Sequence, residues 1–180
     1  MEINVLLGRF FPPQITCPRT EELEVKEIKN MGFNKPIGAL WTSTFTPQNE
    51  YCSDWIKWCV DNMKEWLPTS EDKCWVLIPE DECKIVVINS MQDYLAVLNK
   101  YSIMTSIGRY MIDYEKLSKD YDAIHLTVKA VRDLSFIDSK KYPDIEDFYG
   151  WDVESTAWFR LCFKKIKKLS EISHRCKVRD

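Results

Sequence analysis

Two carboxylates, Asp152 and Glu154, have the spacing in this sequence that most directly suggests chemistry. They lie in residues 150–159, a run rich in aromatic and β-branched residues that is typical of a β-strand. Because successive side chains of a strand point to opposite faces, we expect both carboxylates on one face. Polar faces of antiparallel sheets usually contact solvent, so this face is either an ordinary wet surface or the wall of a cleft.

A third charged side chain, Arg9, interrupts an apolar run near the beginning of the chain. Residues 3–11 predict a first strand that ends at a pair of prolines. Alternation places Arg9 among apolar neighbours, where a guanidinium needs a carboxylate partner or an anionic ligand. The alternative is that Arg9 lies at the end of the strand and reaches solvent.

The sequence predicts strands and helices that do not alternate strictly. Ser53, Ser90 and Asp113 are expected to cap three helices, and the first of these helices carries three tryptophans that are typical of a core. Residues 20–30 fit a short helix or an extended surface segment. The other predictions are a strand at 37–45, a hairpin of strands 74–78 and 84–89, a strand at 121–128, a loop at 132–149 and an amphipathic, lysine-rich end at 163–172. This pattern indicates the α+β class, with mainly antiparallel sheet, in a single domain over residues 1–180.

Composition excludes several classes of protein. A net charge of −3 argues against a protein whose main function is to bind the nucleic-acid backbone, although this net charge is compatible with a local basic patch. The sequence contains no signal peptide and no apolar run long enough to cross a bilayer, so we expect a cytoplasmic protein without a membrane partner. Seven scattered cysteines without a C-x-x-C pair fit neither a zinc site nor a disulfide framework, so we expect no metal and reduced, mostly buried thiols.

Taken in order, Arg9, the run Trp41-Thr42-Ser43-Thr44 and Asp152-Val153-Glu154 resemble the motifs of the ADP-ribosyltransferase superfamily. The resemblance is to its arginine–serine–glutamate branch, to which bacterial toxins and effectors belong. That branch has an arginine on the first strand, an aromatic-x-Ser-Thr-Ser motif and a C-terminal E-x-E or Q-x-E motif. This sequence departs from the pattern, since Phe45 replaces the last serine and Asp152 the first acid. The resemblance implies mainly antiparallel sheets around a ligand cleft with flanking helices.

The resemblance also implies roles for individual residues. Glu154 would stabilise the oxocarbenium-like ribose that forms when the nicotinamide–ribose bond of NAD breaks, and Ser43 would orient Glu154 by a hydrogen bond. Asp152 would guide or deprotonate the acceptor nucleophile. The positions expected to bind NAD as co-substrate are Arg9 at a phosphate, Trp41 at the nicotinamide or ribose, Gly38 where the backbone approaches the ligand, and the neighbouring Thr42 and Thr44.

The leading hypothesis from the sequence is therefore an NAD-dependent mono-ADP-ribosyltransferase that modifies an intracellular protein or nucleic acid, as a bacterial or phage effector or toxin does. An NAD hydrolase on the same fold is an alternative, because the acceptor can be water. A second alternative is a non-enzymatic interaction or inhibitor protein, because aromatic residues make up 13% of the chain and such residues often anchor interfaces. An exposed tryptophan patch away from the carboxylates would favour that alternative.

Overall fold

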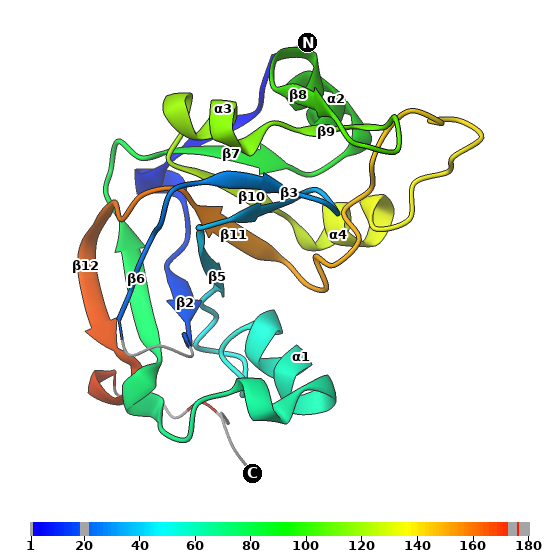
Figure 1. Cartoon of the computed structure of the whole chain (residues 1–180). Helices are drawn as coiled ribbons and strands as arrows, with labels where there is room; N and C mark the ends of the chain where they lie inside the picture. Colours follow the sequence, from blue (N-terminus) through cyan, green and yellow to red (C-terminus); the bar gives the residue numbers. More distant parts are fainter. Residues whose placement is uncertain (1, 19–21, 173–175, 177–180) are drawn as a thin grey trace.

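A computed structural model describes residues 2–18, 22–172 and 176 of the chain. Within them the protein is a mixed α+β structure whose main sheet is curled and mainly antiparallel (Figure 1). Its strands follow the order β1-β7-β10-β11-β5-β2-β6-β12, and only the β7–β10 pair is parallel. The strands of this sheet are β1 (Val5–Leu7), β2 (Gln14–Thr16), β5 (Leu40–Thr44), β6 (Trp75–Pro79), β7 (Lys84–Ile88), β10 (Ala123–Leu126), β11 (Ser155–Trp158) and β12 (Phe163–Lys168).

Two small hairpins and four α-helices flank this sheet in the described part of the chain. The hairpins are β3 (Lys29–Met31) with β4 (Lys35–Ile37) and β8 (Ser102–Met104) with β9 (Tyr110–Ile112). The helices are α1 (Asp54–Asn62), α2 (Met91–Lys100), α3 (Tyr114–Asp120) and α4 (Val128–Leu134). None of the described helices is long and apolar enough to cross a membrane.

The sheet has two halves, each with its own apolar layer (Figure 1). One face of β7 and β10 packs against α2, α3 and α4, while α1 packs against β2 and β6 in the other half. The opposite face of β7 and β10 meets Leu77 and Trp158 in a third cluster between the halves. Alternation along β10 therefore sends Ile124 to the helix side and His125 toward this interior.

The three predicted helix starts are confirmed, because capping depends on neighbouring residues in the sequence. Ser53 accepts a hydrogen bond from the Ile56 backbone N–H (3.1 Å), and Ser90 accepts one from that of Asp93 (3.3 Å). The Asp113 carboxylate accepts a bond from the Lys116 backbone N–H at the start of α3 (3.2 Å).

Several other predicted elements need correction. The strands of the expected hairpin exist as β6 and β7 but do not pair, because β6 bonds to β2 and β12 while β7 bonds to β1 and β10. The first strand ends at Leu7 and is followed by a 3₁₀ turn at Gly8–Phe10. The predicted loop at 132–149 begins inside α4. The lysine-rich end, for which no helix or strand was predicted, forms the edge strand β12. Of the uncertain 20–30 segment, residues 22–28 have no regular structure, residues 29 and 30 belong to β3, and residues 20 and 21 lie outside the described residues.

The expectation that the cysteines are reduced is wrong for two pairs. The structure joins Cys17 to Cys74 and Cys52 to Cys176 in disulfides that span 57 and 124 residues of sequence. Cys59, Cys83 and Cys162 belong to neither disulfide and are buried. The scattered spacing gave no indication of the pairs, because the fold brings their partners together over these long separations.

Candidate functional site

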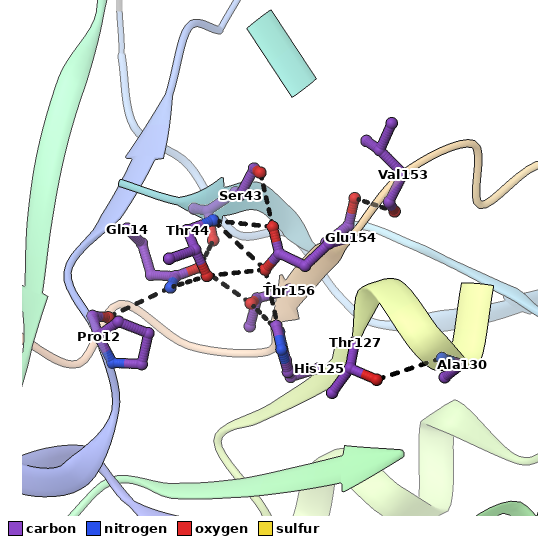
Figure 2. A network of polar contacts seen from close by, with 12 residues as sticks. Pro12, Gln14, Ser43, Thr44, His125, Thr127, Ala130, Val153, Glu154 and Thr156 are labelled. Atoms are coloured by element: carbon purple, nitrogen blue, oxygen red, sulfur yellow. Dashed lines mark hydrogen bonds and ion pairs between the residues drawn. The ribbon is translucent and has the colours of Figure 1, made fainter. Parts of the chain in front are cut away.

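The central position of β11 in the sheet determines where the candidate site forms. This late strand lies between β10 and β5 and pairs antiparallel with both, so it joins the two halves of the sheet. Thr156 of β11 pairs with Thr42 of β5 and with His125 of β10. The end of β5, with Ser43 and Thr44, consequently lies beside Glu154, which immediately precedes β11 (Figure 2).

Glu154 is buried, with 7% of its surface exposed, and it is surrounded by hydrogen-bond donors. Ser43 Oγ donates to Glu154 Oε2 at 2.7 Å, which is the hydrogen bond that the sequence analysis expected. The Thr44 backbone N–H donates to the same oxygen at 3.0 Å, and Thr44 Oγ1 donates to Oε1 at 2.9 Å. Figure 2 shows these groups converging on the carboxyl from the end of β5. The structure thus fixes the carboxyl in one orientation.

The protonation of Glu154 depends on two opposing effects. Burial raises the pKa of the Glu154 carboxyl, and the hydrogen bonds from Thr44 and Ser43 work against that rise. The negative charge of Asp54 contributes further to the raised pKa. Since both oxygens face donors, the surroundings are suited to an ionised carboxylate whose charge is only partly screened by solvent.

A buried polar network supports this arrangement from behind. The Gln14 side chain is fully buried, and its Oε1 accepts hydrogen bonds from Thr42 Oγ1 (2.8 Å) and Thr156 Oγ1 (2.9 Å). Thr42 Oγ1 in turn accepts a bond from the Trp158 indole N–H at 2.9 Å. Gln14 Nε2 donates to the Pro12 carbonyl at 3.2 Å, so both ends of this amide have partners (Figure 2). Such a fully bonded network limits the movement of the strands around Glu154.

His125 completes the network and is neutral. Its Nδ1 lies 2.9 Å from Thr156 Oγ1 and 3.4 Å from Glu154 Oε1. Because the Thr156 hydroxyl donates to Gln14, it must accept from His125, which assigns the proton to Nδ1. Burial lowers the pKa of His125 to about 4. This buried and bonded position is that of a structural histidine.

Two pockets lie on either side of residues 152–153. The first has a volume of about 390 Å³ and is lined mainly by tryptophan rings, with Lys35 and Asp152 as its charged groups. The second, of about 440 Å³, lies between α1 and α4 and includes Glu154 in its wall. Both volumes fall in the range that holds parts of small-molecule ligands. The tryptophans that line the first pocket are Trp41, Trp55, Trp66 and Trp151, and Trp58 lines the second.

Lys35 is the cation of the tryptophan-lined pocket. Its Nζ donates to the Gly150 carbonyl at 2.6 Å and lies 5.1 Å from the centre of the Trp41 ring. Burial lowers the pKa of Lys35, and the neighbouring Asp152 carboxylate opposes that change. Trp41 contacts Trp151 edge to face, with ring centres 4.7 Å apart. The pocket therefore offers flat apolar surfaces beside one ammonium group.

Asp152 and Glu154 do not form the expected pair on one strand face. β11 begins only at Ser155, so Asp152 belongs to the preceding loop and is exposed, while Glu154 is buried. Asp152 nevertheless contributes to both pockets, next to the buried carboxyl. Asp152 thus lies on a solvent-exposed surface, as one interpretation of the sequence expected, and Glu154 lies in the wall of a cleft, as the other expected.

Two of the expected NAD-binding positions lie elsewhere. Arg9 is in the 3₁₀ turn, where its backbone N–H bonds to Asp81 and its guanidinium lies 3.5 Å from Glu82, away from the lining of both pockets. Gly38 has a φ of +88°, and a Cβ there would lie 2.4 Å from the carbonyl oxygen of Glu27. Gly38 therefore accommodates the chain's own backbone and lines neither pocket, and its approach to a ligand stays a prediction.

Thr42 and Thr44 flank Ser43 with different roles. Thr42 is buried in the Gln14 network and contributes to the wall of the tryptophan-lined pocket, while Thr44 holds Glu154. Sequence reasoning missed Gln14 and Lys35, since neither belongs to a motif with Glu154. The only signal for Gln14 was a polar residue next to two prolines and before an isoleucine.

Comparison of this chain with protein-family models, with curated proteins and with solved structures finds no match.

Proposed function

We propose that this protein is an NAD-dependent ADP-ribosyltransferase in which Glu154 stabilises the ribose cation formed when nicotinamide leaves. The observation that carries the proposal is the hydrogen bond of 2.7 Å from Ser43 to the Glu154 carboxyl. Thr44 bonds to the other oxygen of this carboxyl, which also lines a pocket. Electrostatic stabilisation is strongest when the charged group is fixed and partly desolvated before the reaction begins. The same group in a mobile, hydrated side chain would contribute far less.

The reaction would proceed by loss of nicotinamide and attack of an acceptor. The C1′–N bond breaks with both electrons going to nicotinamide, which leaves an oxocarbenium-like ribose opposite the Glu154 carboxylate. The acceptor nucleophile then bonds to C1′ and loses its proton to Asp152, the exposed carboxylate that lines both pockets. If water takes the acceptor's place, the product is free ADP-ribose.

The tryptophan-lined pocket is the proposed site for the nicotinamide end of NAD. Trp41 and Trp151 offer ring faces and edges for a flat heterocycle. Lys35 would take the phosphate-binding role that the sequence analysis gave to Arg9, since it is the cation of this pocket. An effector or toxin setting and a cytoplasmic site of action belong to the same proposal and rest on the motif resemblance.

The test is nicotinamide release from NAD by the Glu154→Gln protein. Glutamine is nearly isosteric but cannot stabilise positive charge, so we expect release to fall by about a thousandfold or more. A Glu82→Gln variant, which neutralises an exposed carboxylate beside Arg9, is the control and should retain full activity. Circular dichroism would verify that both variants are folded. Equal release by wild type and Glu154→Gln would refute the mechanism.

The non-enzymatic alternative required an exposed tryptophan patch. All seven tryptophans lie in the described part of the chain, and none of them belongs to the exposed side chains. Five of them line the two pockets instead. This placement favours a ligand-binding role for the tryptophans over a role as interface anchors.

A further inference from the structure

Three aromatic side chains form an exposed patch near the pockets. Phe136 is 79% exposed, Phe33 58% and Tyr149 55%. Tyr149 lies between the other two, with ring centres 6.0 Å from Phe33 and 6.3 Å from Phe136. We call these three residues the aromatic patch. Contiguous apolar rings in water are unfavourable and commonly mark an interaction surface.

The backbone at Phe33 is strained in a way that holds its ring in solvent. Phe33 has a φ of +67° and Asn34 one of +52°, a region that bulky residues rarely adopt. The fully buried Asn34 anchors this turn, because its side-chain amide donates to Tyr94 Oη (2.7 Å) and accepts from the Ile112 N–H (3.1 Å). A strained residue held by its surroundings suggests a role for the exposed side chain.

The patch residues are near neighbours, along the chain, of residues that line both pockets. Tyr149 directly precedes Gly150, and Phe33 lies two residues before Lys35; both Gly150 and Lys35 line the tryptophan-lined pocket. Phe136 follows Arg132, which lines the second pocket, at the end of α4. A polypeptide that contacts the aromatic patch would therefore lie close to residues that line both pockets.

The charges around the second pocket favour a cationic partner. Its wall contains the carboxylates of Asp54, Asp61, Asp152 and Glu154. Its two cations are already paired, Lys57 with Asp61 at 2.6 Å and Arg132 with Asp133 at 2.8 Å. The phosphates of a nucleic acid would meet this excess of negative charge, whereas lysine or arginine side chains would be attracted by it.

We propose that the aromatic patch is the docking surface for a protein acceptor that presents apolar side chains next to basic ones. The apolar side chains rest on Phe33, Phe136 and Tyr149, and the basic ones face the carboxylates of the second pocket. That the docked protein receives ADP-ribose rests on the proposed transfer activity; the docking itself does not. The proposed acceptor is therefore a protein and not a nucleic acid.

The experiment measures binding of defined probes to the whole protein by fluorescence anisotropy, without NAD. The probes are a fluorescein-labelled peptide of alternating leucine and arginine, a matched peptide with serine in place of leucine, and a single-stranded oligodeoxynucleotide. We expect the leucine peptide to bind at least about tenfold more tightly than the serine peptide, and the oligonucleotide not to bind. A Phe33→Asn/Phe136→Ser double variant should remove this tenfold preference, because asparagine tolerates the positive φ.

Phe10→Ser is the matched control, because Phe10 is 70% exposed but packs over Arg9 away from the pockets. It should leave peptide binding unchanged within about twofold. Preferential binding of the oligonucleotide, no binding of the leucine peptide, or equal binding by wild type and the double variant would overturn the proposal. So would a dimer in sedimentation that the double variant dissociates, because the surface would then belong to a second copy.

Nicotinamide release, measured in parallel without acceptor, separates this proposal from the proposed function. Release that is absent while patch-dependent peptide binding persists would refute the enzyme and leave the docking surface. Release that is normal while binding is independent of the patch would refute the docking surface alone. The double variant itself should release nicotinamide at the wild-type rate, since neither residue lines a pocket.

Discussion

Asn34 and Glu154 are both buried polar side chains with several hydrogen bonds, yet their surroundings differ in one respect. Asn34 is enclosed, with Tyr94, Tyr114, Ile112 and Trp151 bonded to its side chain or carbonyl. Glu154 is bonded as fully on the β5 side but also forms part of a pocket wall. Asn34 is neutral, whereas Glu154 is an acid whose pKa burial raises.

This difference separates a structural polar residue from a candidate functional one. A neutral amide whose nitrogen and oxygen both bond to buried partners stabilises one conformation of the chain. Ionising a buried acid costs free energy. A buried acid in the wall of a pocket is therefore a candidate functional group, because its charge can act on a bound ligand. Hydrogen-bond counts alone would not distinguish the two residues.

The largest effect on stability is expected at Asn34. Asn34→Ala removes the donor to Tyr94 Oη and the acceptor of the Ile112 N–H and places alanine at positive φ, so the free energy of unfolding should fall by about 3 kcal/mol. Urea denaturation would measure this loss. Asn99→Ala, at an exposed position of α2, is the control and should change stability by less than about 0.5 kcal/mol. Glu154→Gln, by contrast, should lose activity without losing stability; a large stability loss there would remove the contrast between the two residues.

The second effect is a pH dependence that arises from His125. Because burial lowers its folded pKa to about 4 from 6.5, the unfolded chain binds a proton that the folded protein does not bind over this interval. Stability should therefore decrease as the pH falls from 6.5 to about 4, by on the order of 3 kcal/mol from this group. The raised pKa of Glu154 acts in the opposite direction, since its stabilising protonated form is lost as the pH rises.

Urea denaturation of wild type and His125→Gln at several pH values between 4 and 7 would isolate this contribution. The free energy of unfolding of the wild type relative to that of His125→Gln should fall as the pH decreases toward 4, because the variant has no imidazole at this position, while groups common to both proteins cancel. His174, which lies outside the described residues, is among those common groups. A difference that is constant with pH would show that His125 titrates normally in the folded protein.

The smallest effect is expected for Ser43→Ala, which removes one of the donors to Glu154 but leaves those of Thr44. Nicotinamide release should fall by about tenfold to thirtyfold, well below the effect of Glu154→Gln, because one hydrogen bond to a charged group contributes about 1.5–2 kcal/mol. Steady-state kinetics should show the loss in kcat more than in KM, since the binding pocket remains. A loss as large as that of Glu154→Gln would mean that Ser43 does more than orient the carboxyl.

Local features of this protein were predictable from the sequence because they depend on neighbouring residues. The caps at Ser53, Ser90 and Asp113 act over three residues, and the aromatic and β-branched run at 150–159 contains strand β11. The α+β class with a mainly antiparallel sheet followed from the same patterns. The Ser43–Glu154 contact was expected from the order of motifs, although 111 residues separate the two.

Tertiary structure alone decided which strands pair and which side chains meet. No local pattern indicates that β6 and β7 join opposite halves of the sheet or that β11 inserts between β10 and β5, because pairing depends on competition among all strand edges. The same is true of the Cys17–Cys74 disulfide and of the meeting of Gln14 with Thr156. The sequence determined which residues have the chemistry for a site. The long-range pairing of the sheet determined that Arg9 lies away from the two pockets and that Lys35 lines one of them. The neighbours of a side chain across a fold are set by packing and not by spacing along the chain.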